Sequence, residues 1–130
     1  MSDKTMNKNL YEKAIEAQKL SYSPYSKVTV GAALLTADDN IYLGANIENS
    51  SYGATVCAER TAIFNAVLSG EKCFKEIVIT SNLDDFIFPC GMCLQVMAEF
   101  SDDLKVFATN AKGEVKEKNI KELFPFAFRL

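Results

Sequence analysis

The sequence predicts an α/β layered domain in which helices cover a mixed sheet. Segments with helical spacing of apolar residues alternate with short segments rich in β-branched and aliphatic residues, in the order α-β-β-α-β-α-β-β-α. The 130 residues are 48% hydrophobic, which is ample for one core. No repeat, low-complexity tract or linker interrupts them. We therefore expect a single domain over residues 1–130.

The first half of the chain predicts a helix followed by a strand hairpin. Leu10 and Ala14 belong to a helical apolar repeat, which indicates an amphipathic helix from about Lys4 to Ser21. Strands are expected at Val28 to Thr36 and Ile41 to Ile47, because both segments are rich in aliphatic and β-branched residues. The polar residues 38–40 between them are typical of a turn.

The second half alternates helices and strands. A helix is expected from Cys57 through Ser69, with Gly70 placed to end it, and a short strand from Glu76 to Thr80. Pro89 suits the first turn of the next helix, which continues from Cys90 to Phe100. Three further elements complete the pattern: a strand at Leu104 to Thr109, an antiparallel edge strand at Glu114 to Lys118 after the turn at 110–113, and a last short helix capped by Asn119.

Charge and hydropathy exclude several classes of partner. The formal net charge of -3 argues against a nucleic-acid surface, which needs clustered Lys and Arg. No apolar run approaches the roughly 20 residues of a membrane-spanning helix, and the polar start lacks the apolar core of a signal peptide. We expect a cytoplasmic protein that binds a small molecule, in which cysteines serve as thiols or metal ligands.

Three cysteines in a chain without histidine indicate a metal site. They occur in Cys57-Ala58-Glu59 and in Cys90-Gly91-Met92-Cys93, each at the start of an expected helix. Residues three apart share a helical face, so Cys90 and Cys93 can bind one ion. Three protein ligands leave the fourth position of a tetrahedral zinc open, as in catalytic sites, and Glu59 would then move protons. Cys73 stands apart from this set.

Taken singly, the same residues have simpler interpretations. Cys90 and Cys93 alone suit a redox dithiol or half of a structural zinc site. Glu59 alone is typical of a solvated carboxylate in a first helical turn, and Arg60 of a surface charge. Asn46 and Glu48 alone suit the end of a strand.

The combination of motifs resembles the cytidine deaminase family, of the small homotetrameric type with an all-cysteine zinc site. The resemblance extends over nearly the whole chain. It rests on Ser23-Pro24-Tyr25-Ser26, Val30-Gly31-Ala32-Ala33-Leu34, Asn46-Ile47-Glu48-Asn49, Ser51-Tyr52-Gly53, Thr55-Val56-Cys57-Ala58-Glu59-Arg60-Thr61-Ala62-Ile63 and Pro89-Cys90-Gly91-Met92-Cys93.

This resemblance implies a three-layer fold with a mixed five-stranded sheet, and zinc held by Cys57, Cys90 and Cys93. The zinc would lower the pKa of a bound water from about 15.7 toward 7. Glu59 would pass a proton from that water to N3 of the pyrimidine and assist the departure of ammonia from C4. The implied activity is deamination of cytidine and deoxycytidine to uridine and deoxyuridine in pyrimidine salvage.

Two neighbours of the cysteines carry implied supporting roles. Arg60 resembles the family arginine that donates hydrogen bonds to the ligand sulfurs and offsets their negative charge. Gln95 matches a family position near the metal. The family usually carries a second arginine after its last zinc cysteine, but this chain has Leu94 there. Arg60 is therefore expected to supply more of the compensating charge.

The resemblance also implies a nucleoside site shared between subunits of a homotetramer. Asn46 and Glu48 match residues that bind the ribose 3′-hydroxyl, and Ala58 would present its backbone to the pyrimidine. Val28 stands where the family commonly has a phenylalanine beside the substrate. Tyr52 and Phe128 resemble aromatic residues that reach a neighbouring subunit's ribose and base.

Three other functions stay open on the sequence alone. Val28 and Leu94 leave room for a deaminase of the same fold that acts on another cytosine-containing compound. A noncatalytic zinc-binding or interaction domain is a second alternative. A thiol redox protein that uses Cys90 and Cys93 is the third. Editing of a polynucleotide is disfavoured because the chain has no basic stripe.

Overall fold

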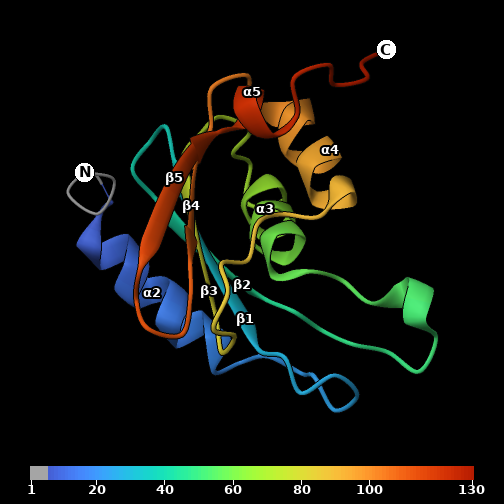
Figure 1. Ribbon diagram of the computed structural model, residues 1–130. Helices are drawn as coiled ribbons and strands as arrows, with labels where there is room; N and C mark the ends of the chain where they lie inside the picture. Colours follow the sequence, from blue (N-terminus) through green and yellow to red (C-terminus); the bar gives the residue numbers. More distant parts are fainter. Residues whose placement is uncertain (1–5) are drawn as a thin grey trace.

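A computed structural model of the protein describes residues 6–130 as a three-layer α/β/α structure. One helix covers one face of the sheet, and the other helices cover the opposite face (Figure 1). The helices are α2 (Lys8–Gln18), α3 (Ala58–Leu68), α4 (Gly91–Phe100) and α5 (Ile120–Leu123), with the 3-10 helix η1 (Tyr52–Ala54). The strands are β1 (Val30–Thr36), β2 (Ile41–Ala45), β3 (Phe74–Ser81), β4 (Lys105–Thr109) and β5 (Val115–Asn119).

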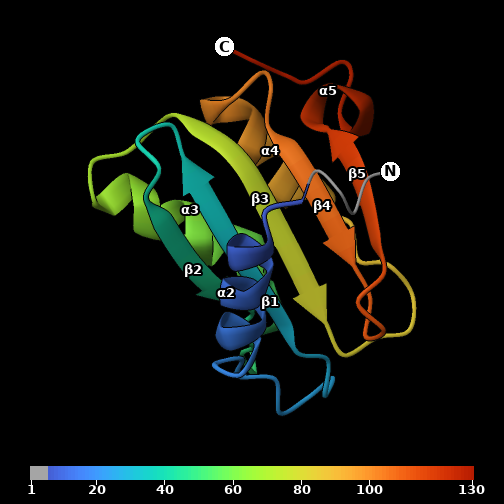
Figure 2. The ribbon, with the colours of Figure 1, turned by 90° about the vertical axis from the view of Figure 1, so that its left-hand side faces the viewer.

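The sheet is mixed, which confirms the predicted fold class. Its order is β2-β1-β3-β4-β5, as Figure 2 shows with α2 in front. β3 and β4 are parallel and all other neighbours are antiparallel. A parallel pair needs a crossover connection, and here α4 provides it. The predicted antiparallel edge strand is β5.

The first helix is shorter than the sequence predicts. It begins at Lys8 because the side chain of Asn7 accepts a hydrogen bond from the backbone N–H of Leu10, an N-cap arrangement. The predicted start at Lys4 lies outside the described residues. The helix ends at Gln18, three residues before the predicted end at Ser21. The chain then leaves the helix, and the backbone of Tyr22 pairs with that of Ile47.

Strand boundaries also differ from the prediction, and β2 ends at Ala45, two residues before the predicted end at Ile47. β3 runs from Phe74 to Ser81, longer than the predicted strand, because its pairing with β1 continues at both ends. β1 begins at Val30 and not at Val28, since the preceding residues form a loop that side chains hold. The short helix η1 has no counterpart in the sequence prediction.

Two glycines let helices approach both faces of the sheet closely. A Cβ at Gly31 would lie 2.2 Å from the carbonyl oxygen of Ala14 in α2. A Cβ at Gly44 would lie 2.3 Å from the carbonyl oxygen of Ala58 and 2.4 Å from the nitrogen of Ala62 in α3. Both distances are too short for any side chain, so glycine fixes where α2 and α3 dock.

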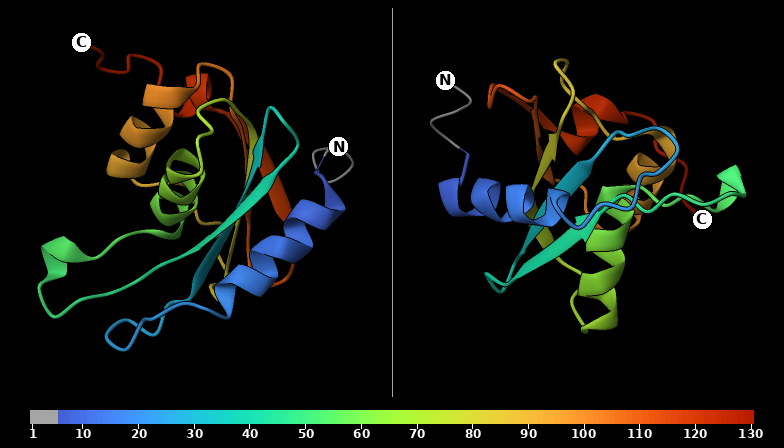
Figure 3. Two further views of the ribbon diagram at one scale, coloured as in Figure 1. Left: turned by 180° about the vertical axis from the view of Figure 1, so that it is seen from behind. Right: turned by 90° about the horizontal axis from the view of Figure 1, so that it is seen from below.

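Successive residues of the central strands point to opposite faces of the sheet and so belong to two different hydrophobic clusters. Ala33, Val78 and Phe107 pack against α2, whereas Ile77 and Ile79 belong to the larger cluster under α3 and α4. The chain from the end of β2 through η1 to the start of α3 projects away from these layers (Figure 3). Within residues 6–130, no helix has the length and apolar character needed to cross a membrane.

Candidate active site

The structure brings together the three cysteines that the sequence singled out. Cys57 is the N-cap of α3 and Cys90 is the N-cap of α4, which confirms that both stand at helix starts. Cys93 follows one turn along α4 and is buried. The Sγ atoms of Cys57 and Cys90 lie 3.8 Å apart, and those of Cys90 and Cys93 lie 3.5 Å apart. Cys73 is an exposed thiol outside this cluster.

Hydrogen bonding makes the cluster partly thiolate. The Cys93 hydrogen bond and the guanidinium of Arg60 lower the pKa of Cys57 to about 5, although burial opposes this. Arg60 Nη2 donates to Cys57 Sγ over 3.5 Å. The hydrogen bond with Cys57, together with burial, raises the pKa of Cys93. The positive ends of α3 and α4 also favour negative charge at Cys57 and Cys90.

The donor set fits zinc. In a tetrahedral site with Zn–S bonds of about 2.3 Å, the sulfurs are about 3.8 Å apart. The two sulfur–sulfur distances of 3.8 and 3.5 Å are close to this value, and all three sulfurs lie within 4.8 Å of one another. Thiolates are ligands that zinc binds well, and three of them leave one coordination position free. The residues could therefore hold one zinc ion.

Glu59 is buried beside the cluster. It is the second residue of α3, and only 3% of its surface is exposed. Burial raises the pKa of Glu59 to about 7, and the negative charge of Cys57 adds to the rise. The interpretation of Glu59 as a solvated first-turn carboxylate is thus wrong. A carboxyl that titrates near neutral pH can both accept and donate a proton.

An isolated backbone bridge links the cysteine cluster to a second group of candidate residues. Ile47 and Val56 exchange two backbone hydrogen bonds, of 2.9 and 3.0 Å, on either side of η1. Each of the two residues that flank Ile47 is a predicted ribose ligand, and Cys57 follows Val56 directly. The bridge therefore fixes Asn46 and Glu48 relative to the start of α3.

The side chains of Asn46 and Glu48 hold the loop that precedes β1. Asn46 Nδ2 donates to the carbonyl oxygen of Val28 over 2.8 Å, and Asn46 Oδ1 accepts from the backbone nitrogen of Val30 over 2.9 Å. Glu48 Oε1 accepts from the backbone nitrogens of Tyr25 and Ser26, over 2.9 and 3.1 Å. Glu48 Oε2 accepts from the hydroxyl of Ser26.

A cavity of about 370 Å³ opens at Glu48. Its lining residues are Tyr25, Ser26, Glu48, Asn49, Tyr52 and Thr55. Asn46 is 8% exposed, whereas Tyr52 is 78% exposed and meets the ring of Tyr25 edge to face, with 6.2 Å between centroids. The structure thus places Tyr52 at the cavity of its own chain.

The remaining predicted site residues are dispersed. Ala58 is buried at the start of α3, and Val28 and Leu94 are half-buried against the larger cluster. Gln95 Nε2 donates to the carbonyl oxygen of Phe128 over 3.0 Å, so its amide holds the C-terminal segment. The ring of Phe128 is exposed.

Ser26 and Thr61 contact site residues in the structure, although the sequence predicted no site role for either. Ser26 lies in a quoted motif, but only the fold shows that its hydroxyl reaches Glu48. Thr61 Oγ1 donates to the carbonyl oxygens of Ala45 and Ala58, each over 2.9 Å, and so joins the end of β2 to the start of α3. The hydroxyl types alone gave no signal, because Ser and Thr are common at helix starts and turns.

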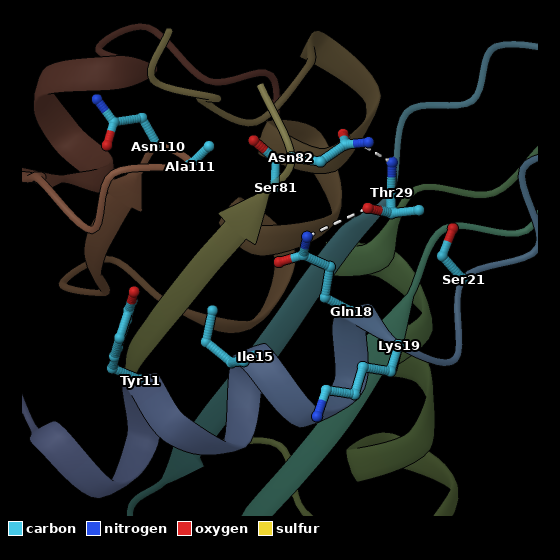
Figure 4. Close-up of a pocket in the computed structure, with 10 residues that line it drawn as sticks. All are labelled: Tyr11, Ile15, Gln18, Lys19, Ser21, Thr29, Ser81, Asn82, Asn110 and Ala111. Atoms are coloured by element: carbon cyan, nitrogen blue, oxygen red, sulfur yellow. Dashed lines mark hydrogen bonds between the residues drawn. The ribbon is translucent and has the colours of Figure 1, made fainter. Parts of the chain in front are cut away.

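Another cavity, of about 470 Å³, lies on the α2 side of the sheet. Its lining includes Gln18 of α2, Thr29 ahead of β1 and Asn82 after β3 (Figure 4). Gln18 Nε2 donates to Thr29 Oγ1 over 3.1 Å, and Asn82 Oδ1 accepts from the backbone nitrogen of Thr29 over 3.0 Å. Gln18 Nε2 and Asn82 hold the loop before β1, whereas Gln18 Oε1 is buried without a hydrogen-bond partner among the described residues. None of the three clustered cysteines lines this cavity or the Glu48 cavity.

The three-layer fold and a cluster of three thiols at two helix starts define a class of zinc-binding α/β/α enzymes. Comparison with known proteins identifies the family within it. Residues 4–109 match the model of the cytidine and deoxycytidylate deaminase zinc-binding region. The chain belongs to this family, which confirms the recognition made from the motifs, the prediction of an enzyme and zinc as its cofactor.

Individual relatives agree with the family match. The chain is 47% identical over 114 residues to a cytidine deaminase of Sporosarcina psychrophila, covering 87% of this chain and 84% of that protein. It is 46% identical over 120 residues to one of Halalkalibacterium halodurans, covering 92% and 91%. The crystal structure of cytidine deaminase from Burkholderia pseudomallei superposes with a TM-score of 0.90 at 42% identity, covering 95% of this chain and 100% of that chain.

Proposed function

We propose that this protein hydrolytically deaminates cytidine and deoxycytidine in pyrimidine salvage. The reaction adds water at C4 of the pyrimidine and releases ammonia, giving uridine or deoxyuridine. Bound zinc would supply a Lewis acid that ionises water at neutral pH. Cys57, Cys90 and Cys93 would hold it, since their sulfurs have the spacing of a tetrahedral site.

The observation that carries this proposal is the buried carboxyl beside the thiol cluster. Glu59 is the acid–base residue because burial brings its pKa to about 7. It would take a proton from the attacking water, deliver it to N3 of the pyrimidine and then protonate the departing amine. Its protein surroundings exclude bulk water, so the proton stays with the reacting groups.

The Glu48 cavity supports a nucleoside as the substrate. It opens at a carboxylate, which can accept a hydrogen bond from the ribose 3′-hydroxyl. Asn46 would position this site, and it has an amide N–H left after its bond to the carbonyl of Val28. Ala58 would present backbone to the base at the start of α3. The half-buried Val28 would form a smaller wall than phenylalanine and so admit other cytosine-containing compounds.

We further propose one domain over residues 1–130 and a cytoplasmic homotetramer with shared sites. Exposed aromatic side chains support the assembly: Tyr52 is 78% exposed and Phe128 is 65% exposed. Such side chains favour an interface over free solvent. Arg60 would tune the thiolates, whereas Gln95 would act by holding the segment that carries Phe128.

Metal content and turnover, measured on one preparation, test the proposal. Zinc-loaded protein is expected to contain one zinc per chain and to release ammonia from cytidine and deoxycytidine. Cys90→Ser should lose the metal and the activity, whereas Cys73→Ser, at an exposed thiol outside the cluster, should keep both. A zinc-loaded protein that turns over neither nucleoside would overturn the substrate. A reversible Cys90–Cys93 disulfide with no metal would instead indicate a redox protein.

A further inference from the structure

The geometry points to Ser26 as a positioning residue for the ribose subsite, acting through Glu48. This inference rests on the proposed function, because it concerns how Glu48 meets the substrate 3′-hydroxyl. Ser26 was not among the predicted site residues. It lies in the loop between α2 and β1 and lines the 370 Å³ cavity together with Glu48.

Glu48 has most of its acceptor capacity occupied by this loop. Its two oxygens offer about four lone-pair positions. The backbone nitrogens of Tyr25 and Ser26 take two positions on Oε1, and the Ser26 hydroxyl takes one on Oε2. The Ser26 hydroxyl is also the largest influence that lowers the pKa of Glu48. The remaining position on Oε2 is available to a ligand hydroxyl in the cavity, and Ser26 decides its direction.

A second bond of the same hydroxyl fixes its own orientation. Ser26 Oγ accepts from the backbone nitrogen of Val28 over 3.0 Å, so its hydrogen is free to point at Glu48. The carbonyl oxygen of Val28 in turn accepts from Asn46 Nδ2 over 2.8 Å. Ser26 and Val28 therefore connect the two predicted ribose ligands, Asn46 and Glu48, in one hydrogen-bonded chain.

The loop is also held by a residue other than Asn46 and Glu48. Asn82 Nδ2 donates to the carbonyl oxygen of Lys27 over 2.9 Å, and Asn82 Oδ1 accepts from Thr29. Lys27 has a φ of 65°, a conformation that non-glycine residues adopt only where the surroundings enforce it. The backbone at residue 26 is thus anchored independently of its side chain, so removal of the hydroxyl should change Glu48 more than the loop.

The test compares two substrates that differ by one hydroxyl, cytidine and 3′-deoxycytidine, on zinc-loaded full-length protein. Ser26→Ala is expected to raise KM for cytidine by about tenfold, the scale of one hydrogen bond to a charged group, and to leave kcat within about twofold. KM for 3′-deoxycytidine should be the same in Ser26→Ala and the unchanged protein. Ser26→Thr keeps the hydroxyl and should restore most of the affinity for cytidine.

Control variants separate positioning from loop damage. Tyr22→Phe removes an exposed hydroxyl from the same loop, and we expect it to leave both KM values unchanged. In a Glu48→Gln background, Ser26→Ala should add little to the loss. If Ser26→Ala fails to fold, Ser26→Cys replaces it, because a thiol fills similar space but is a weak donor.

The possible failures are distinguishable. Equal losses on both substrates, or no rescue by Ser26→Thr, would overturn the inference and leave the deaminase proposal standing. An unchanged KM for cytidine in Ser26→Ala would do the same. If the unchanged protein deaminates neither nucleoside, the proposed function fails, and the inference fails with it.

Discussion

Arg60 Nη2 donates a hydrogen bond to the Sγ atom of Cys57 over 3.5 Å, from one turn further along α3. The Nε atom of Arg60 is buried and has no hydrogen-bond partner among the described residues. Leu94, at the position where the family usually has a second arginine, packs instead against the larger hydrophobic cluster. Arg60 therefore places positive charge directly on a thiolate.

Arg60→Gln is expected to slow cytidine turnover by about 10- to 100-fold while one zinc per chain is retained. Without the guanidinium, the three thiolates keep more negative charge and leave the zinc a weaker Lewis acid. Steady-state rates, measured with metal analysis, check this. Arg60→Lys should recover part of the rate, and Lys75→Gln, which changes a surface ion pair with Asp39, controls for lost charge. Full activity in Arg60→Gln would contradict the role.

Glu59→Gln should reduce kcat by about 10²- to 10⁴-fold with zinc content unchanged. Glutamine keeps the size of the buried side chain but can no longer take up and release the proton. Ammonia release and metal content measured together check this expectation. Glu99→Gln, at an exposed position on α4, is the matched control. Unimpaired turnover in Glu59→Gln would favour the noncatalytic zinc domain.

Gly44→Ala should lower the free energy of unfolding. Overpacking typically costs about 1–3 kcal/mol, and we expect a loss at or above the upper end of that range. The new methyl group would meet backbone atoms of α3 at 2.3 and 2.4 Å, so the helix must move. Because α3 carries Cys57 and Glu59, activity should fall with stability. Urea unfolding checks the effect. Gly53→Ala is the control, since a Cβ there meets no atom within 4 Å, and an equal loss in that variant would refute the packing argument.

Glu76→Gln should stabilise the protein most at alkaline pH. Burial raises the pKa of Glu76, the nearby Glu117 adds to the rise, and Lys105 and Lys75 oppose it. Its Oε1 is buried without a hydrogen-bond partner in the part of the chain that the structure describes. A raised carboxyl pKa favours folding while the group is protonated, and this contribution is lost as pH rises through the folded-state value.

Unfolding free energies of the two proteins at several pH values check the Glu76 prediction. The variant's advantage should be largest above the raised folded-state pKa of Glu76 and shrink as the pH falls below it. Thiol protonation at low pH releases zinc from both proteins alike. Comparing the two proteins at the same pH therefore removes this contribution from the difference. A difference that is independent of pH would show that ionisation of Glu76 is not the cause.

The sequence predicted elements better than their ends. The strands and the larger helices follow from local apolar spacing, and Gly70, with a φ of 92°, ends α3 as expected. The first helix ends early at Gln18 because the following residues pair with the distant segment at Ile47. Such pairing joins residues far apart in sequence, and no local pattern records it.

The candidate site also has features that local sequence signals predict and features that depend on tertiary contacts. The positions of Cys57 and Cys90 at helix starts could be predicted from local signals. The burial of Glu59 depends on how α3 docks at Gly44, and the contact between Ser26 and Glu48 depends on two loops that meet in space. Gln95 shows the same limit, because its partner, the backbone of Phe128, lies 33 residues away.

The thiol cluster also links metal retention to the cooperativity of the whole fold. Cys57 and Cys90 are 33 residues apart, and α3 and β3 lie in the segment between them. An ion that joins these sulfurs closes that long loop. In the native fold the sulfurs are already close together, whereas the unfolded chain would lose conformational entropy to bring them together. Because the ion binds the native arrangement, the melting temperature should rise with free zinc. The proposed catalytic centre would thus also hold α3 and α4 together, and a chelator should lower the melting temperature as it removes the activity.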